Sequence, residues 1–480
     1  MSERLNVDLC VIGAGSGGLA VAAGASQLGQ KVVLCERARM GGDCLNYGCV
    51  PSKSLLAAAR AATAARNAAR FGVEAVSPRV DYRVVRDHVR GVIAAIAPND
   101  SVERFTGLGV RVIRAHAAFA GPDVVKAGDA TIRARRFVIA TGSSPAVPPI
   151  PGLAREDAQD GVPFLTNETI FDLADRPSHL LVLGGGPVGC ELAQAHRRLG
   201  ANVTVIEAAS LLSQDDPELV DFVRLQMLRD GIGIHEGAKV IRAEGRAGDI
   251  ALVVEKNGIE HRITGSHLLV AAGRCANVDG LNLEAAGVAY SPKGIEVDAR
   301  LRTSNRRIYA IGDVTGGYRF THVAGYHAGI VIRNALFRLP AKVDYRVLPW
   351  VTYTDPELAH VGLTEVEANR RGEKIRILRW PFHENDRAQC ERETHGLVKV
   401  IASPNGRVLG AGIVGAHAGE LIPVWGLAIA RGLKLKHVAE LIVPYPTLGE
   451  VNKRAAGTFY APKLFSPLAR RIVRWLSYLG

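Results

Sequence analysis

Cys44 and Cys49 lie five positions apart in the stretch GGDCLNYGCVPSK, residues 41–53, of a chain with 7 cysteines among 480 residues. Two thiols at this spacing could form a structural disulfide, supply half of a metal site, or open and close as a disulfide during turnover. Each alternative makes a different demand on the rest of the sequence.

The sequence gives little support to a metal site or to a structural disulfide. Zinc needs about four N, O or S ligands, and no second Cys/His pair is evident, so we predict no metal site. Five residues of regular helix rise about 7.5 Å, more than the usual Cα separation of about 4.4–6.8 Å across a disulfide. A bridge therefore needs irregular backbone, which Gly48 and Pro51 permit, and so short a loop stabilises the fold little. A loop beside a helix N-terminus suits a reactive thiolate, which favours the redox alternative.

A redox pair needs an electron carrier, and two copies of one nucleotide-binding pattern are present. Residues 5–36 and 180–207 each contain an apolar strand, a glycine loop, a helix-like stretch and a second apolar strand that ends in Glu. In each copy three glycines permit a tight turn, close approach to a pyrophosphate, and contact between helix and strand. They are Gly13, Gly15 and Gly18 in the first copy, and Gly184, Gly186 and Gly189 in the second.

The two copies end in Glu36 and Glu207, where a carboxylate can hydrogen-bond ribose hydroxyls. Glu207 would repel a 2′-phosphate, and residues 208–210, Ala-Ala-Ser, offer no Arg to compensate. The second copy therefore favours NAD(H) over NADP(H). Two dinucleotide sites in one chain indicate a flavin paired with a nicotinamide.

With these features the chain resembles the disulfide-reductase flavoproteins, which include dihydrolipoamide dehydrogenase, glutathione reductase and mercuric reductase, over nearly its whole length. Residues 41–53 look like the redox-disulfide signature of that family, and residues 137–145 and 268–281 look like its two crossover strands. Residues 307–317 look like its second FAD motif, and residues 350–368 look like the start of its dimerisation domain.

The resemblance implies an α/β fold with two doubly wound Rossmann-type domains, one for FAD and one for NAD, and a C-terminal α+β dimerisation domain. The FAD-binding domain would comprise residues 1–150 and 276–345, interrupted by an NAD(H)-binding domain at 151–275. The interface domain would span 346–465 and a basic amphipathic tail 466–480. A homodimer with FAD and NAD(H) as cofactors is expected.

The same resemblance assigns roles to single residues. Cys49 would lie against the flavin and form the charge-transfer thiolate, and Cys44 would be the interchange thiol that meets the substrate. Lys53 and Glu191 match the family's ion pair near the reactive nitrogen of the flavin. Electrons would pass from NADH to FAD and then to the cysteine bridge. The remaining candidate cofactor contacts in the quoted motifs are Gly42, Lys53, Gly142, Gly273 and, at the ribityl chain, Asp313.

One position departs from the thiol-disulfide members of the family, which carry a His-Pro-Thr stretch followed by Glu. Here residues 441–457 keep Glu450 but have Tyr445 in the histidine position. A phenol with a pKa of about 10 is a poor proton shuttle at neutral pH. The tyrosine favours mercuric reductase, although no cysteine follows Cys390 to form the C-terminal pair that mercuric reductases carry.

We therefore expect an FAD-dependent oxidoreductase, mercuric reductase-like, that passes electrons to a thiol/disulfide or metal-ion substrate. One alternative is a dihydrolipoamide dehydrogenase with an altered base. Another, of a different class, is a nucleotide-binding flavoprotein sensor or membrane-associated electron carrier.

Charge and composition limit the partners. The net charge of +12 is spread along the chain without a zinc-finger or RNP-type motif, so we expect no nucleic-acid partner. A basic balance suits phosphate-bearing ligands. Neither a secretory signal nor an apolar run of spanning length is evident, so a cytoplasmic protein is expected.

The tail, residues 466–480, has an amphipathic pattern. Its apolar side chains recur at helical spacing beside three arginines; they are Leu468, Ile472, Trp475, Leu476 and Leu479, with Arg470, Arg471 and Arg474. Its short length favours a helix docked on its own dimer. The alternative is a helix that contacts an anionic membrane surface.

Overall fold

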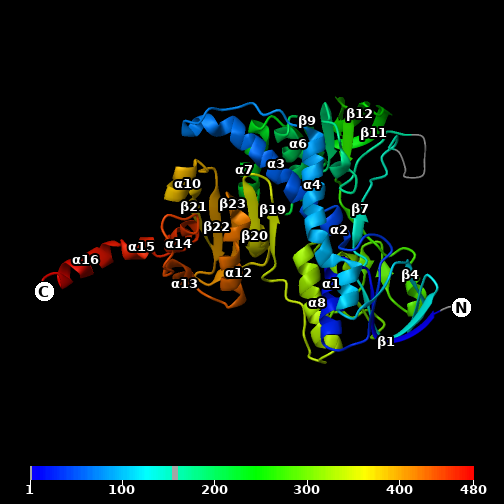
Figure 1. Ribbon diagram of the computed structural model, residues 1–480. Helices are drawn as coiled ribbons and strands as arrows, with labels where there is room; N and C mark the ends of the chain where they lie inside the picture. Colours follow the sequence, from blue (N-terminus) through cyan, green and yellow to red (C-terminus); the bar gives the residue numbers. More distant parts are fainter. Residues whose placement is uncertain (1–2, 154–160, 480) are drawn as a thin grey trace. The chain divides into compact units, whose positions relative to one another are not determined.

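The computed structural model describes residues 3–153 and 161–479. Contacts divide the chain into two compact units (Figure 1). The first comprises Met1–Ala208 and Gly233–Val343, and the second Ala209–Ile232 and Asp344–Gly480. The predicted domain boundaries stay predictions, because this division follows contacts and assigns part of the 151–275 segment to the second unit.

The first unit contains a seven-stranded sheet in the order β3-β2-β1-β6-β5-β4, with β18 also paired to β6. The pairs β1·β2, β1·β6, β2·β3 and β6·β18 are parallel, and β4, β5 and β6 run antiparallel. The strands are β1 (Glu3–Ile12), β2 (Val32–Cys35), β3 (Arg111–Ile113), β4 (Ala117–Gly121), β5 (Val124–Ala127), β6 (Ala130–Ile139) and β18 (Ile308–Ala310). Strand β2 and the end of β1 are wholly buried, as apolar parallel strands require.

A second, fully parallel sheet in this unit has the order β10-β9-β8-β14. Its strands are β8 (His179–Leu183), β9 (Asn202–Glu207), β10 (Gly233–Glu236) and β14 (His267–Val270). A three-stranded antiparallel sheet follows, with β11 (Lys239–Arg246), β12 (Asp249–Lys256) and β13 (Ile259–Gly265). The parallel strands β3, β2, β1, β6 and β18 of the first sheet and the fully parallel second sheet agree with the predicted doubly wound α/β architecture.

Helices of the first unit position the cysteine stretch. Helix α3 (Cys49–Asn67) packs against α4 (Tyr82–Ile96) and α6 (Pro187–Arg198), while α1 (Ser16–Gln27) packs against α8 (Thr321–Ala335). The Ala-rich stretch after Leu56 is a strong helix former, and it makes most of α3. Two short helices, α2 (Gly42–Asn46) and α5 (Val102–Gly107), complete this region, and β7 (Ser143–Pro145) pairs with β15 (Arg274–Ala276) where the two predicted crossovers lie.

The second unit is built on an antiparallel sheet in the order β19-β20-β23-β22-β21. Its strands are β19 (Pro349–Thr352), β20 (Glu357–Gly362), β21 (Arg376–Pro381), β22 (Leu397–Ala402) and β23 (Val408–Gly415). Around the buried Trp425, the core includes residues of α12 (Pro423–Ala430) and α14 (Glu450–Gly457). The other helices are α7 (Pro217–Arg229), α9 (Glu365–Arg370), α10 (Asp386–Glu391), α11 (Ala418–Leu421), α13 (Leu435–Ala439), α15 (Ala461–Leu464) and α16 (Pro467–Leu476).

The tail forms a helix, as predicted, and α16 covers Pro467–Leu476; Gly480 lies outside the described residues. Among the described residues no helix combines the length and the apolar character needed to cross a membrane.

A buried lysine joins α7 to the sheet of the second unit. Lys399 on β22 lies 2.7 Å from Asp216, 2.8 Å from Glu218 and 2.7 Å from Glu365, each measured from Nζ to a carboxylate oxygen. The side chains of Lys399 and Asp216 are 4% and 5% exposed. Removing the cation would leave the buried Asp216 beside the partly exposed Glu218 and Glu365, of which Glu218 would keep its ion pair with Arg379.

We therefore expect Lys399→Met to lower the free energy of unfolding by about 3 kcal/mol. This is the lower end for breaking a buried pair, because Glu218 and Glu365 are partly exposed. Urea unfolding followed by fluorescence measures the loss, and the loss should shrink at acid pH as the carboxylates become protonated. The control Lys374→Met removes an exposed lysine of the same unit. Equal midpoints for the two variants would contradict the prediction.

Candidate active site

The cysteine stretch contains the irregular backbone that the spacing requires. Helix α2 ends at Asn46 and α3 begins at Cys49, with Tyr47 and Gly48 outside both helices. A Cβ placed on Gly48 would lie 2.9 Å from a carboxylate oxygen of Asp43, so the turn has no room for a larger residue. The break folds the chain back and brings the two cysteine side chains together.

Cys44 and Cys49 are free thiols that hydrogen-bond to each other. The hydrogen bond from Cys44 lowers the pKa of Cys49 to about 6, and Thr321 and the charge of Lys53 act in the same direction. The Thr321 hydroxyl lies 3.4 Å from Cys49 Sγ. The same thiol–thiol hydrogen bond, together with burial, raises the pKa of Cys44. At neutral pH the pair therefore consists of a Cys49 thiolate and a Cys44 thiol.

Lys53 and Glu191 form the predicted ion pair. Lys53 Nζ lies 2.9 Å from Glu191 Oε2, and the Glu191 side chain is 6% exposed. Lys53 is four residues after Cys49 on α3, so both lie on the same face of that helix. Glu191 belongs to α6, the helix that follows the second glycine loop. The pair therefore joins the cysteine segment to the second nucleotide-binding sheet.

The two glycine loops have matching geometry. Gly13 and Gly184 have φ values of +104° and +115°, in the region that favours glycine. A Cβ on Gly18 or Gly189 would lie 1.9 Å from the carbonyl oxygen of Gly13 or Gly184, respectively. These contacts are the tight turn and the close helix approach that the sequence pattern predicts.

The helices after these loops suit a bound pyrophosphate. Helix α1 begins after Gly15 and α6 after Gly186, and neither has a side-chain N-cap or an acidic residue in its first turn. Backbone N–H groups and the positive end of the helix dipole therefore face the loop. These donors fit the diphosphates of FAD at the first loop and of NAD(H) at the second.

The two terminal carboxylates lie beside their loops. Glu36 accepts hydrogen bonds from the backbone N–H groups of Ala14 and Ala38, both at 2.6 Å, and Glu207 accepts one from Gly185, also at 2.6 Å. Each carboxylate is thus held at the carboxyl end of its strand, where the sequence places the ribose contact.

Three further predicted glycines lie at the borders of these elements. Gly42 is packed on the first loop, since a Cβ on it would lie 2.6 Å from the Cα of Gly15. Gly142 and Gly273 have φ values of +72° and +130° next to the paired strands β7 and β15. Their predicted contacts with cofactor stay predictions.

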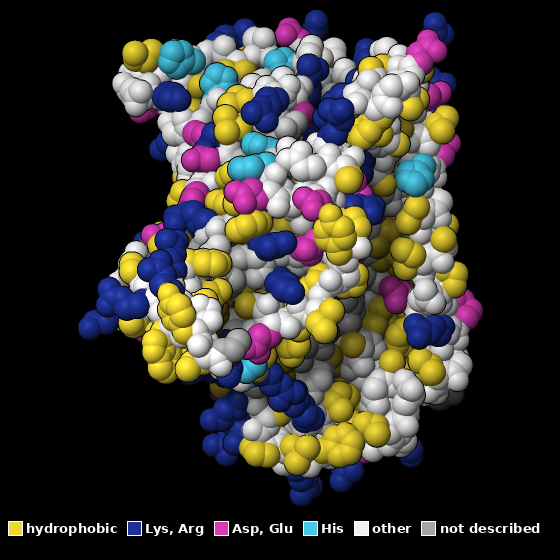
Figure 2. All heavy atoms as spheres, turned by 90° about the vertical axis from the view of Figure 1, so that its left-hand side faces the viewer, with side chains coloured by type: hydrophobic (Ala, Val, Ile, Leu, Met, Phe, Trp, Pro, Cys, Tyr) yellow, Lys and Arg dark blue, Asp and Glu magenta, His cyan; other side chains and the backbone are white. Residues whose placement is uncertain are grey.

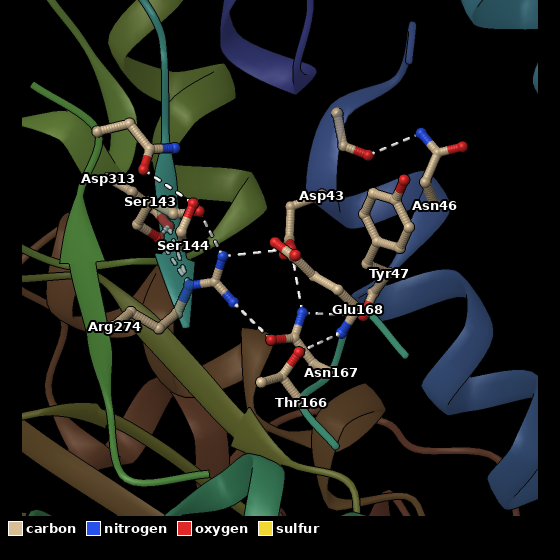
Figure 3. A network of polar contacts seen from close by, with 12 residues as sticks. Asp43, Asn46, Tyr47, Ser143, Ser144, Thr166, Asn167, Glu168, Arg274 and Asp313 are labelled. Carbon is tan, nitrogen blue, oxygen red and sulfur yellow. Dashed lines mark hydrogen bonds and ion pairs between the residues drawn. The ribbon is translucent and has the colours of Figure 1, made fainter. Parts of the chain in front are cut away.

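An arginine that the sequence analysis did not single out connects the predicted parts (Figure 3). Arg274 donates to the backbone carbonyl and the hydroxyl of Ser143, at 2.6 and 2.7 Å, and lies 3.2 Å from Asp43. Asn167 donates to the same Asp43 oxygen at 3.1 Å. Asp43 directly precedes Cys44, so this network holds the cysteine segment against the crossover strands. Asp43 directly precedes Cys44 and Arg274 directly follows Gly273, so their positions next to motif residues could have marked both for attention.

Asp313 belongs to the same network. It accepts a hydrogen bond of 2.6 Å from the Ser143 hydroxyl, and burial raises its pKa. Its position beside β7 fits the predicted contact with the ribityl chain, which stays a prediction.

Cys44 also lines a cavity of about 400 Å³. Its walls include the apolar side chains of Leu19, Ile96 and Phe105, and two charged residues, Asp100 and Arg104. Burial raises the pKa of Asp100. The cavity therefore offers one thiol, one carboxyl and one guanidinium to a ligand that enters it, a set that the cysteine motif did not reveal.

Tyr445 and Glu450 lie in the second unit. The Tyr445 hydroxyl donates to Asp386 at 2.8 Å, and this hydrogen bond raises the pKa of the phenol. Glu450 is the first residue of α14. A phenol with a raised pKa stays protonated at neutral pH, so little phenolate is present to accept a proton.

Comparisons with known proteins agree with this geometry. The pyridine nucleotide-disulphide oxidoreductase family profile matches residues 7–328, and the profile of that family's dimerisation domain matches residues 348–456. The chain is 38% identical to a mercuric reductase of Streptomyces lividans (96% of this chain, 97% of the relative) and 33% identical to a dihydrolipoyl dehydrogenase of Geobacillus stearothermophilus (94% and 96%). The Cu(II) complex of RclA, an HOCl-induced flavoprotein disulfide reductase of Escherichia coli, superposes with a TM-score of 0.83 at 27% identity, covering 93% of this chain and 99% of the other.

The low pKa of Cys49 can be measured on the reduced protein. We expect the far-ultraviolet absorbance of the thiolate to titrate with a pKa of about 6, so that the signal is present at pH 7 and lost below pH 6. Lys53→Met should raise this pKa because a nearby positive charge favours the thiolate. Cys49→Ser should abolish the transition, whereas Cys44→Ala should shift it upward by removing the thiol that donates to Cys49. A transition that survives in Cys49→Ser would contradict the assignment.

Proposed function

The chain belongs to the pyridine nucleotide-disulphide oxidoreductase family, whose members bind FAD and use NAD(P)H, and we propose that it is a mercuric reductase-like enzyme of this family. Electrons would pass from nicotinamide through flavin and the Cys44/Cys49 pair to a metal-ion or thiol/disulfide substrate. The observation that carries the proposal is the Cys49 thiolate hydrogen-bonded to a Cys44 thiol that opens on a cavity. The dimerisation domain at 348–456 supports a homodimer.

In this proposal the chain's own residues bind the two cofactors and hold the reactive thiols. The N-termini of α1 and α6 bind the pyrophosphates, and Glu36 and Glu207 orient the riboses. The chemistry that FAD supplies when bound is the exchange of a hydride from nicotinamide for two electrons that reduce a disulfide. Reduction of the Cys44–Cys49 disulfide with two electrons and one proton would leave a thiolate at Cys49 and a thiol at Cys44, in keeping with the lowered pKa of Cys49 and the raised pKa of Cys44.

Glu207 supports a preference for NADH over NADPH. Its carboxylate is fixed beside the second loop by the Gly185 N–H group, so it cannot easily turn away from a 2′-phosphate.

The state of Tyr445 favours a metal ion over a disulfide as substrate. Thiol–disulfide exchange requires the interchange thiol to lose and regain a proton, and Tyr445, held by Asp386, provides no base of suitable pKa. A soft metal ion that binds thiolate displaces the thiol proton itself, because coordination lowers the pKa of the thiol. The name of the mercuric reductase relative agrees with this substrate class, and the structural neighbour, a disulfide reductase by name, is a Cu(II) complex.

Asp100 supplies the remaining proton chemistry in this proposal. It lines the same cavity as Cys44, and its raised pKa brings the carboxylate closer to the basicity that removal of a thiol proton requires. Asp100 would thus take the proton that Cys44 loses in the slow reaction with disulfides, for which Tyr445 offers no base.

Dihydrolipoamide dehydrogenase is the second candidate function. The dihydrolipoyl dehydrogenase relative is 33% identical, and the matched region covers 96% of its length, which supports this activity. The tyrosine at position 445 opposes it, because the reaction requires proton transfer at the interchange thiol.

A substrate panel tests the choice. With NADH and FAD-loaded enzyme we expect reduction of Hg(II) or Cu(II), and slow turnover of lipoamide, glutathione disulfide and quinones. Tyr445→His should raise the lipoamide rate by about 10²-fold, the lower range for a general base. Tyr445→Phe, the matched control, should leave the metal rate unchanged. Rapid lipoamide turnover by the wild type would favour dihydrolipoamide dehydrogenase, and NADPH rates above NADH rates would refute the role of Glu207.

Asp100 has a separate test. We expect Asp100→Asn to lower the slow disulfide rate by about 10²-fold while the Cys49 pKa and FAD content stay unchanged. Because the active form is the carboxylate, the wild-type rate should rise with pH through the raised pKa of Asp100, and this limb should vanish in Asp100→Asn. Asp100→Glu should restore part of the rate. An unchanged pH profile in Asp100→Asn would exclude Asp100 as the base.

A further inference from the structure

Helix α16 and the residues around it present a large apolar surface to solvent. None of the residues of α16, Pro467–Leu476, is buried. Within the second unit the helix extends away from the sheet (Figure 1). The exposed fractions of Leu468, Ile472, Trp475 and Leu476 are 65%, 48%, 62% and 49%. Nothing in the described part of the chain covers these side chains.

The apolar and basic side chains lie on opposite faces of α16. Leu468, Ile472 and Leu476 follow one another at intervals of four residues, and Trp475 lies beside them, so they form one continuous stripe. Arg470, Arg471 and Arg474 occupy the other face. Figure 2 shows the side of the molecule from which α16 extends, with hydrophobic side chains next to Lys and Arg side chains.

An isolated helix of 10 residues, the length of α16, is not stable by itself in water. Isolated helices shorter than about 12–15 residues are marginal in water, and their stability comes from covering an apolar face. The stripe on α16 therefore needs a partner surface.

Charge identifies the chemistry of that surface. Residues 461–480 contain Lys463, Arg470, Arg471 and Arg474 and no Asp or Glu. These four charges are part of a net charge of +12, so the other 460 residues carry +8. The segment therefore holds no negative charge that would weaken its attraction to an anionic surface. A protein partner would also have to match the stripe, but a lipid surface accepts any apolar side chain.

The side-chain types also fit the boundary between lipid headgroups and acyl chains. Trp475 and Tyr478 are 62% and 81% exposed, and Phe465 is 64% exposed at the end of α15. Aromatic rings with a polar edge are enriched at this boundary, and a helix with arginines on one face and Trp, Phe and Leu on the other binds in its plane.

We propose that α16 is a peripheral membrane anchor that places this enzyme on an anionic phospholipid surface. The apolar stripe enters the headgroup boundary, and the three arginines contact phosphate groups. In a homodimer two such helices would act together, because binding of the first raises the effective concentration of the second at the surface. The anchor is independent of the substrate that Cys44 reduces.

Vesicle cosedimentation of the full-length holoenzyme tests the anchor. We expect binding to vesicles of phosphatidylcholine with phosphatidylglycerol, little binding to phosphatidylcholine alone, and weaker binding as salt rises. The triple variant Arg470→Gln/Arg471→Gln/Arg474→Gln should bind on the order of 100-fold more weakly, since each basic residue near an anionic surface contributes about fivefold. Trp475→Ser should also weaken binding and should remove a blue shift of tryptophan fluorescence seen with vesicles.

A matched control removes the same charge elsewhere. Arg79→Gln/Lys126→Gln/Arg246→Gln changes three exposed residues of the first unit and should bind like the wild type. NADH-dependent activity in solution should be unchanged in both triple variants, which separates the anchor from the proposed reaction. Equal binding of the tail variant and the wild type would overturn the proposal. The proposal would also be overturned if the wild type did not bind vesicles and the tail variant were monomeric. The helix would then be a contact between the two subunits of the dimer.

Discussion

The 2.9 Å ion pair between Lys53 and Glu191 is the constraint on which the site depends. It joins α3, whose first residue is Cys49, to α6, which starts at the second glycine loop. Glu191 is buried and Lys53 is 37% exposed, so loss of Lys53 would take this cation away from a buried carboxylate. The pair therefore links the helix that carries Cys49 and Lys53 to the helix that follows the second glycine loop.

The charges around this pair control the two thiols. Lys53 favours the Cys49 thiolate and Asp43 opposes it, while Arg274 lies 3.2 Å from Asp43 and compensates that negative charge. The hydrogen bond between the thiols lowers the pKa of Cys49 and raises the pKa of Cys44, so the proton stays mainly on Cys44. A small change in this balance would alter how much thiolate exists at neutral pH, without any change of fold.

Tyr445 shows that the fold of the family can be kept while a side chain at a reactive position differs. The family's nucleotide sheets and dimerisation domain are present, yet the residue at the place of the usual base is a phenol bound to Asp386. Fold and cofactor use follow from backbone geometry, which many side chains tolerate. Proton transfer depends on the pKa of one side chain, so one substitution can move an enzyme between substrate classes.

The sequence by itself determined the glycine loops, the two terminal carboxylates, the reactive spacing of Cys44 and Cys49, and the amphipathic helix near residue 470. Each depends on neighbours within one turn or one βα unit, so local spacing is sufficient. Tertiary structure decided that Arg274 meets Asp43, that Asp386 holds Tyr445, and that Asp100 shares a cavity with Cys44. These residues are 56 to more than 200 positions apart in sequence, and the contacts arise from how sheets and helices pack, which no local pattern encodes.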